Sequence, residues 1–417
     1  MEPLFPCFFF PKEDDQVSFP NEFLEEIISD ILSRLPVKTL LQFRTVSKPW
    51  LSLISDRSFA KLHLHHAGHS TALFISAYDH ATNKRHFLSA PRGGGPVTHL
   101  TTLDDTATVT SKETTEAEHL NGLVLFTSGN GFIVNNFAFV LNPSTRKIFK
   151  VPGPASENPD QTYGKVHICY FFGFDESRNE HKILTVRMLD IRSVTPFKPT
   201  TIEIMIFSMS NHTWRTIDID LPFDVSGDHW YYGTKHSVCV NSVIHVMLQS
   251  QNEILAFDLK TENFSIISIP QDAVPRETDK RYYKKGMNTV KSNQPVVIKI
   301  NGLLGIICHD RVVECNEMDI WILQDYENRV WVKETVLFSK SWFLLDGPFP
   351  LNPVLRRVII LKRRLTRVVI SVPIYDLESR SVEPVKYTLD HQFLHSSAVR
   401  FDHVRSYVES IFPLERN

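Results

Sequence analysis

Four histidines in one short stretch are the residues with the clearest capacity for chemistry. They are His63, His65, His66 and His69, and imidazole is a common zinc ligand. A zinc site usually adds a second pair of ligands elsewhere in the chain, often cysteines, and none of the five cysteines lies nearby. We therefore expect an exposed linker here and no bound metal.

Sequence motifs for catalysis are missing from the chain. It has no G-x-S-x-G, no phosphate-binding loop, no dinucleotide fingerprint and no HExxH. The five cysteines are odd in number, scattered and without a CxxC pair, which argues against a disulfide framework. The sequence thus predicts no catalytic residue and no cofactor.

One run of basic residues is a weak candidate for binding. No acidic residue interrupts it, and it flanks the predicted strand 358–361 with Arg356, Arg357, Lys362, Arg363, Arg364 and Arg367. The favoured interpretation is a solvated hairpin turn. The alternative is a patch for an acidic or phosphorylated partner.

Composition excludes several classes of protein. The 417 residues are 42% hydrophobic and 22% charged, which is ordinary for a globular protein. With 45 basic and 47 acidic residues the net charge is −2, so no overall charge points to nucleic acid. Apolar runs are far shorter than the roughly 20 residues needed to span a bilayer. We expect residues 1–17 to be a flexible tail.

Residues 18–66 form a unit with helical periodicity. Apolar residues recur every three or four positions over 21–35, again over 37–46, and in a third short stripe over 50–54. Pro36 separates the first two stripes, and Ser47 before Lys48-Pro49 restarts the chain. We therefore expect three short helices. Their apolar stripes are too wide for so small a unit to cover, so the surplus must pack on the rest of the chain or on a partner.

Three segments of this unit together resemble an F-box. They are Phe19-Pro20-Asn21-Glu22, Asp30 to Leu40, and Phe43 to Ile54. The middle segment is nearly the family pattern, and the order Val-x-Lys-x-Trp at 46–50 is a second marker. The chain departs from the family at the start of the first helix, where Phe23-Leu24 replace the usual Leu-Pro.

Resemblance to F-boxes implies a helical bundle that binds the SKP-type adaptor of a cullin–RING ubiquitin ligase through its surplus apolar face. Matched to the family pattern, the adaptor-binding residues would be Phe23, Leu24, Ile27, Ile31, Leu32, Leu35, Pro36, Val37, Leu40, Leu41, Val46 and Trp50. Some of these form the bundle's own core. The double change Leu40→Ala with Leu41→Ala is expected to weaken adaptor binding.

A different pattern recurs from residue 70 onward. An apolar strand leads into a polar turn, and an aromatic or β-branched residue follows six positions after the first residue of the turn. We call these first residues anchors, and they are Asn142, Ser208, Asp258, Asp325 and Asp376. Successive anchors are 66, 50, 67 and 51 residues apart. Asp79 is a sixth, degenerate anchor. Each anchor predicts a β-hairpin.

A second feature keeps the same spacing. Asn121-Gly122, Asn241-Ser242 and Asn301-Gly302 mark turns that are 120 and 60 residues apart. Four strands per 50–67 residues are typical of propeller blades, so about six blade-like units are expected over 70–417, with an irregular β-sandwich as the alternative. Gly93-Gly94-Gly95 is expected in a loop. The predicted fold class is α+β and multidomain, with a small all-α bundle before an all-β, propeller-like domain.

The β region also has a family resemblance. Over about 121–270 the chain is similar to the F-box-associated domain of plant F-box proteins, through Asn121-Gly122-Leu123, Asn142 to Arg146, Phe172 to Asp175, His181 to Leu184, and Ser208 to Trp214. The resemblance implies a domain that presents a target protein.

The preferred hypothesis is therefore a non-catalytic substrate-recognition subunit of an SKP–cullin–F-box ubiquitin ligase, acting by proximity. It would bind the adaptor, through it the cullin and RING subunits, and an unidentified protein target, in the cytoplasm or nucleus. One alternative is an F-box interaction protein outside a working ligase. The other is a propeller that binds a ligand or acts as an enzyme.

Overall fold

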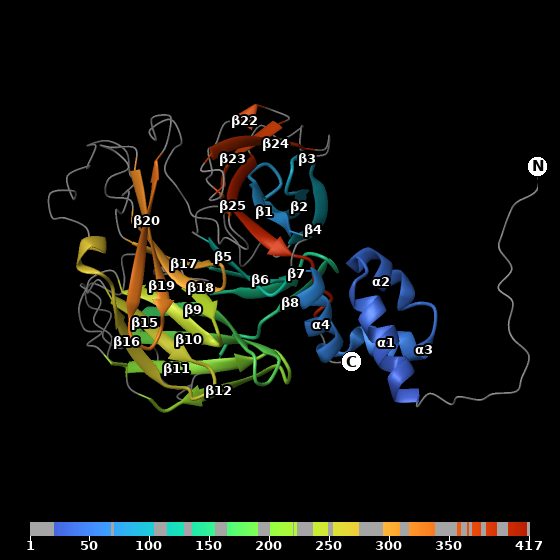
Figure 1. The fold of residues 1–417 in the computed structure, drawn as a ribbon, viewed down its shortest axis with the longest axis horizontal. Coiled ribbons are helices and arrows are strands. Elements are labelled where there is room, and N and C mark those ends of the chain that lie inside the picture. Colours follow the sequence, from blue (N-terminus) through green and yellow to red (C-terminus); the bar gives the residue numbers. More distant parts are fainter. Residues whose placement is uncertain are drawn as a thin grey trace, which may run out of the picture.

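The arrangement of the chain is taken from a computed structural model. It describes residues 21–67, 71–103, 115–128, 136–154, 165–190, 201–219, 221–222, 237–248, 253–274, 295–308, 317–337, 357–359, 365–366, 369–376, 381–389 and 399–414. Helices come first and strands follow (Figure 1). None of the helices in these ranges is long and apolar enough to cross a membrane. The expected tail, residues 1–17, lies outside them.

The described helices form one bundle of α1 (Asn21–Ser33), α2 (Val37–Phe43), α3 (Lys48–Ser55) and α4 (Arg57–Ala67). As expected, Pro36 precedes α2 and Ser47 caps α3, its Oγ accepting the Trp50 N–H at 3.3 Å. The expectation of three helices is wrong, because α4 is a fourth. The Asp56 carboxylate starts it by accepting the N–H groups of Ser58 and Phe59 at 2.7 and 3.2 Å.

The described strands form six sheets, and the strands of each sheet are named in their spatial order. The first sheet contains β25 (Val399–Val408), β1 (Thr71–Asp79), β2 (Lys84–Pro91) and β4 (Thr98–Leu103), and the second contains β5 (Thr115–Leu120), β6 (Leu123–Ser128), β7 (Ala138–Asn142) and β8 (Lys147–Lys150). The third contains β9 (Lys165–Asp175), β10 (Glu180–Asp190), β11 (Thr201–Ser208) and β12 (Thr213–Ile217), and the fourth contains β13 (Ser237–Val240), β14 (Val243–Leu248), β15 (Glu253–Asp258) and β16 (Phe264–Ser268). The fifth contains β17 (Val296–Ile300), β18 (Leu303–Cys308), β19 (Glu317–Asp325) and β20 (Val330–Leu337), and the sixth contains β21 (Arg357–Ile359), β23 (Val369–Asp376), β24 (Ser381–Thr388) and β3 (Gly95–Pro96), with β22 (Leu365–Thr366) also paired to β23. A 3-10 turn, η2 (Gln271–Ala273), follows β16.

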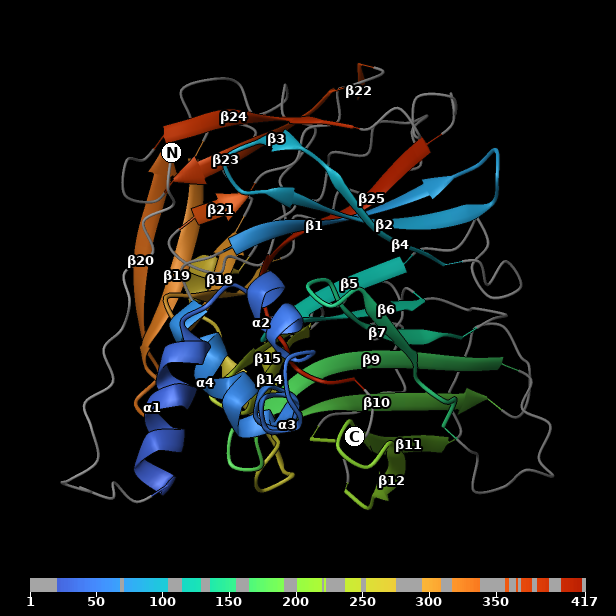
Figure 2. The same cartoon turned by 90° about the vertical axis from the view of Figure 1, so that its right-hand side faces the viewer.

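The sheets are arranged around a common centre, with the helical bundle in front of them in Figure 2. The strands at the inner ends of neighbouring sheets contact one another in the order β25, β5, β9, β13 and β17. These five sheets therefore radiate outward from a shared axis, as the blades of a propeller do.

The two ends of the β region meet in one sheet. β1 pairs antiparallel with β25, so the first and last strands of the region lie side by side. A second junction joins β3 in parallel to β24, through Gly95 and Pro96. Of the glycines at 93–95, which were expected in a loop, Gly93 and Gly94 precede the strand and Gly95 begins the short edge strand β3. Gly94 has φ +92° and approaches the Lys386 carbonyl too closely for a Cβ, which would lie 2.7 Å from that oxygen.

The predicted turns are confirmed as hairpins. The Asn121-Gly122, Asn241-Ser242 and Asn301-Gly302 pairs have positive φ at both residues and join the first two strands of their sheets. At the anchors Asn142, Asp258 and Asp325, the side-chain oxygen accepts the N–H groups two and three residues ahead.

The residue six positions after each anchor pairs across the hairpin with a residue before the anchor. These pairs are Leu141 with Ile148, Phe207 with Trp214, Phe257 with Phe264, Leu323 with Trp331, and Tyr375 with Val382. Cross-strand pairs of large apolar side chains stabilise antiparallel strands, which explains why the pattern repeats. Asp175 begins a further turn of this kind, between β9 and β10, which the sequence pattern did not predict.

A continuous hydrophobic core joins the helical bundle to the sheets. Leu32, Leu40 and Phe59 of the bundle belong to the same cluster of buried side chains as Phe172 of β9 and Phe412 near the C-terminus. Part of the bundle's surplus apolar surface is therefore packed on the β domain.

Candidate functional site

Some apolar side chains of the bundle remain exposed to solvent. Their exposed fractions are 42% for Ile27, 56% for Ile31, 64% for Val46 and 43% for Leu51. Ile27 and Ile31 are four residues apart on α1 and so lie on one side of that helix. We call these four residues the exposed apolar set. They are the part of the surplus that the β domain leaves uncovered, and Leu51 is the member that the sequence analysis missed.

The other predicted adaptor-binding residues are covered to different extents. Leu32, Val37 and Leu40 are buried, and Leu40 has no exposed surface. Leu35, Leu41 and Trp50 are partly buried against the same core, whereas Pro36 is exposed. Phe23 and Leu24 lie in α1, but their side chains are outside the described part of the structure.

The burial of Leu40 corrects the test proposed from sequence. Removing a fully buried leucine side chain leaves a cavity in the bundle, so Leu40→Ala is expected to destabilise the fold. Weakened adaptor binding by that variant would not distinguish a lost contact from a lost structure. The exposed apolar set provides substitutions without this ambiguity.

The four histidines do not gather around one point as far as the chain is described. His63 is buried on α4 and its Nε2 donates to the Leu35 carbonyl at 3.0 Å, and burial lowers its pKa. His66 Nδ1 lies 2.7 Å from Ser33 Oγ at the end of α1. His69 is outside the described residues. The two placed contacts attach α4 to the end of α1 and to the turn that follows it, where they act as structural links.

The basic run falls almost entirely outside the described residues. Arg357 begins the short strand β21 and pairs with Asp376 of β23, but its side chain is not described. Arg356, Lys362, Arg363, Arg364 and Arg367 lie outside the described ranges. The interpretation of this run as a binding patch therefore stays a prediction.

Arg57, the first residue of α4, is held by two turns of one sheet. Its guanidinium donates to the Met209 carbonyl, at the turn between β11 and β12, over 3.1 Å. The side-chain amide of Asn179, in the turn between β9 and β10, donates to the Arg57 carbonyl at 2.8 Å. Burial lowers the pKa of Arg57, while the charge of Glu180 acts in the opposite direction. The bundle thus sits at the end of the sheets where these turns lie.

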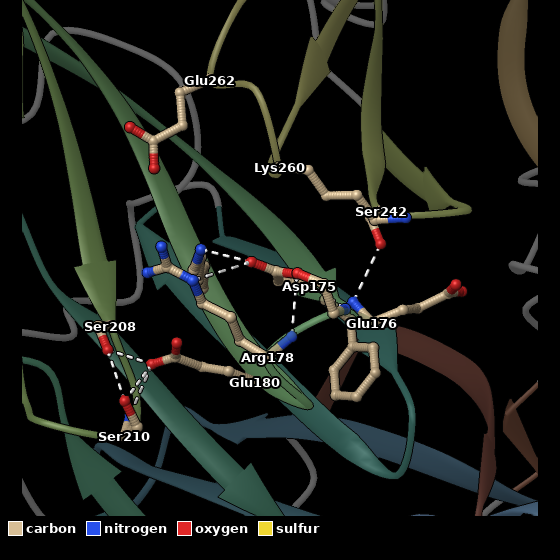
Figure 3. A network of polar contacts seen from close by, with 12 residues as sticks. Asp175, Glu176, Arg178, Glu180, Ser208, Ser210, Ser242, Lys260 and Glu262 are labelled. Carbon is tan, nitrogen blue, oxygen red and sulfur yellow. Dashed lines mark hydrogen bonds and ion pairs between the residues drawn. The ribbon is translucent and has the colours of Figure 1, made fainter.

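Both turns are stiffened by a network of polar contacts, shown in Figure 3. Lys182 Nζ contacts Asp175 Oδ2 at 2.7 Å, and both side chains are almost fully buried. Burial alone would raise the pKa of Asp175, but hydrogen bonds from Lys182 and Ser177 hold it below its usual value. The Glu180 carboxylate accepts hydrogen bonds from the hydroxyls of Ser208 and Ser210. The network fixes the surface on which Arg57 rests.

Two glutamates lie on β5, one of the strands around the axis. Glu118 accepts hydrogen bonds from Ser237 Oγ of β13 at 2.8 Å and from the Phe172 N–H of β9 at 3.1 Å. Burial raises the pKa of Glu118 to about 8 and that of Glu116 to about 7, while the charge of Arg405 on β25 acts to lower the latter. Glu118 therefore connects strands of three sheets around the axis.

Comparison with known families identifies both parts of the chain. A family model described as the F-box associated beta propeller domain matches residues 69–403, and one described as the F-box domain matches residues 20–62. The first match covers most of the chain, so the protein belongs to the family with an F-box associated beta propeller domain. The resemblance seen in the sequence is confirmed, the β domain is a propeller, and the sandwich alternative is wrong.

Three curated relatives of the chain are from Arabidopsis thaliana. F-box protein At1g30790 is 25% identical over 331 residues, which cover 74% of each chain. F-box protein CPR1 is 26% identical, over 74% of this chain and 71% of its own. Putative F-box protein At3g47150 is 23% identical over 93% of this chain and 95% of its own. These matches support a role as an F-box substrate receptor.

Proposed function

We propose that the protein is the substrate-recognition subunit of an SKP–cullin–F-box ubiquitin ligase. The observation that carries the proposal is the exposed apolar set on a helical bundle that matches the F-box family. Burial of large apolar side chains is the main source of free energy in protein association, and exposed side chains of this kind are available for it. The SKP-type adaptor is the partner that the F-box match indicates.

In this proposal the protein contributes no catalytic residue. The bundle binds the adaptor, and through it the cullin and RING subunits, while the propeller holds the target near the charged ubiquitin carrier. We also propose that each described sheet is one blade, and that the ligase works in the cytoplasm or nucleus. Because the bundle covers the turn end of the sheets at Arg57, the target binds elsewhere on the propeller.

The test is the affinity of the full chain for a purified SKP-type adaptor. In the double variant Ile31→Lys with Val46→Lys, two desolvated contacts would be replaced by charges, and we expect binding at least about 30-fold weaker, equivalent to about 2 kcal/mol. The matched control is Val330→Lys with Val332→Lys, because these valines of β20 are similarly exposed, at 48% and 43%, and lie outside the bundle.

Equal affinity of both double variants and the parent chain would overturn the docking surface. A second readout concerns the ligase itself: the cullin should copurify with the parent chain and be lost with the bundle variant. Adaptor binding without the cullin would instead favour an interaction protein outside a working ligase.

A further inference from the structure

The chain continues past its last strand in a short buried segment, residues 410–414, which we call the C-terminal segment. β25 ends at Val408, on the side of the β domain that faces the helical bundle in Figure 1. Ser410, Ile411, Phe412 and Leu414 are all buried, with at most 3% of any of them exposed.

The main chain of the segment is hydrogen-bonded to turns of two sheets. The side-chain amide of Asn142 donates to the carbonyls of both Ser410 and Phe412, each at 3.0 Å, and Ser144 Oγ accepts the Ser410 N–H at 3.0 Å. Nε2 of His212, in the turn between β11 and β12, donates to the Leu414 carbonyl at 3.0 Å. The segment is therefore bound along its length to the same end of the sheets on which Arg57 rests.

The side chains of the segment belong to the hydrophobic core that spans the propeller and the bundle. The Phe412 ring packs edge-on against His181 at 5.0 Å between ring centroids and lies 5.9 Å from Phe174. Ile411, Phe412 and Leu414 share one hydrophobic cluster with Leu32, Val37, Leu40 and Phe59 of the bundle. The core that spans bundle and sheets thus includes a third component, the apolar residues of the C-terminal segment.

We propose that the C-terminal segment is the tie that fixes the helical bundle on the propeller. The ring is closed by β25 before the segment begins, so the segment is not needed to close it. The direct hydrogen bonds between bundle and sheets described above both involve Arg57, and a single residue can act as a pivot. The apolar side chains of the segment remove that freedom. If the protein has the function proposed above, the same tie also sets the direction in which a bound target faces the ubiquitin carrier.

The experiment measures the distance between bundle and propeller in the full chain. Spin labels are attached at Gln42→Cys on α2 and Glu334→Cys on β20, both exposed positions, with Cys7→Ser and Cys315→Ser to remove other labelling sites. Pulsed electron–electron double resonance then gives the distribution of the distance. We expect one narrow distribution in the full chain and in a control chain that ends at Leu414. A chain that ends at Glu409 should give a distribution at least twice as wide.

An unchanged narrow distribution in the chain ending at Glu409 would overturn the proposal. If that chain does not fold, Phe412→Ala with Leu414→Ala replaces it, because this variant keeps the main-chain hydrogen bonds and removes the apolar contacts. Again, a widened distribution supports the tie and an unchanged one overturns it. Adaptor affinity is measured on the same chains and should be equal in all of them. If the full chain did not bind the adaptor, the proposed function would be contradicted, but the conclusion from the distance distributions would still hold.

Discussion

Gly122 and Ser410 are in such close contact that no other residue type fits at position 122. A Cβ built on Gly122 would lie 1.9 Å from the Ser410 Cβ, and Gly122 has φ +85°. The turn between β5 and β6 therefore passes directly against the C-terminal segment. The sequence pair Asn121-Gly122 predicts the turn, but nothing in it predicts this neighbour.

The first prediction separates the contact from the backbone strain. Gly122→Ala should destabilise the chain by about 2–4 kcal/mol, because it combines a positive φ with the overlap on Ser410. Gly302→Ala is the matched control, since Gly302 has φ +80° at the equivalent turn and no atom within 4 Å of its added Cβ. It should cost about 1 kcal/mol. Urea denaturation measures both, and equal losses would mean that the C-terminal segment moves aside without cost.

Glu118 is expected to make the stability of the propeller fall as the pH rises. Its folded-state pKa of about 8 is above the ordinary value of 4.5, so the folded protein keeps a proton that the unfolded chain releases. The stabilisation by protonated Glu118 is complete below about pH 4.5 and is lost as the pH rises through about 8. Between these values the free energy of unfolding falls by up to about 1.4 kcal/mol per pH unit. Glu118→Gln should reduce this slope. The same slope in Glu118→Gln and in the exposed control Glu334→Gln would contradict the assignment.

The buried ion pair of Lys182 with Asp175 gives a prediction about uncompensated charge. Lys182→Met should destabilise the chain by about 3–5 kcal/mol, because it leaves the buried Asp175 carboxylate without its cation. Adding Asp175→Asn should restore part of that loss, since the amide oxygen can still accept the turn hydrogen bonds. Arg178→Ala is the control, as Arg178 is exposed and its Nε is 3.9 Å from Asp175. Thermal unfolding of the four chains tests this, and no recovery in the double variant would count against it.

The division of the bundle into core and exposed residues predicts two separable effects. Leu40→Ala should lower the free energy of unfolding by about 2–5 kcal/mol, because its side chain is fully buried. Ile31→Ala should change it by less than about 0.5 kcal/mol while weakening adaptor binding. Calorimetry and titration with the adaptor measure the two quantities. A large loss of stability in Ile31→Ala would place Ile31 in the core instead.

Local patterns in the sequence predicted the repeated elements well. Asn142, Asp258 and Asp325 form their turns through their own side chains and the next few N–H groups, so the information is contained in adjacent residues. The turn at Asp175, which was not predicted, uses the same side-chain hydrogen bonds. It joins the first two strands of its sheet, β9 and β10, whereas three other sheets have a two-residue turn such as Asn121-Gly122 at that place. The helix α4 was missed although Asp56 is a normal cap, because it follows α3 without a break in composition.

Contacts between distant segments could not be predicted in this way. Asn142 and Phe412, or Arg57 and Met209, meet only because the ring of sheets brings them together. For the same reason the sequence could not separate Leu40, which is buried, from Ile31, which is exposed, since both fit the apolar periodicity of their helices. The propeller-facing side of the bundle is defined by residues far along the chain.

The pairing of β1 with β25 also governs how the protein can be made. A ribosome completes the bundle and β1 early, but the strand that pairs with β1 begins only at Val399. Until then the nascent chain carries an unpaired strand edge and the apolar residues that later share a core with Phe412, and such surfaces are prone to aggregation and are bound by chaperones. Synthesis that stops short of β25 therefore yields neither a closed ring nor a fixed bundle, so that truncated products should go to degradation.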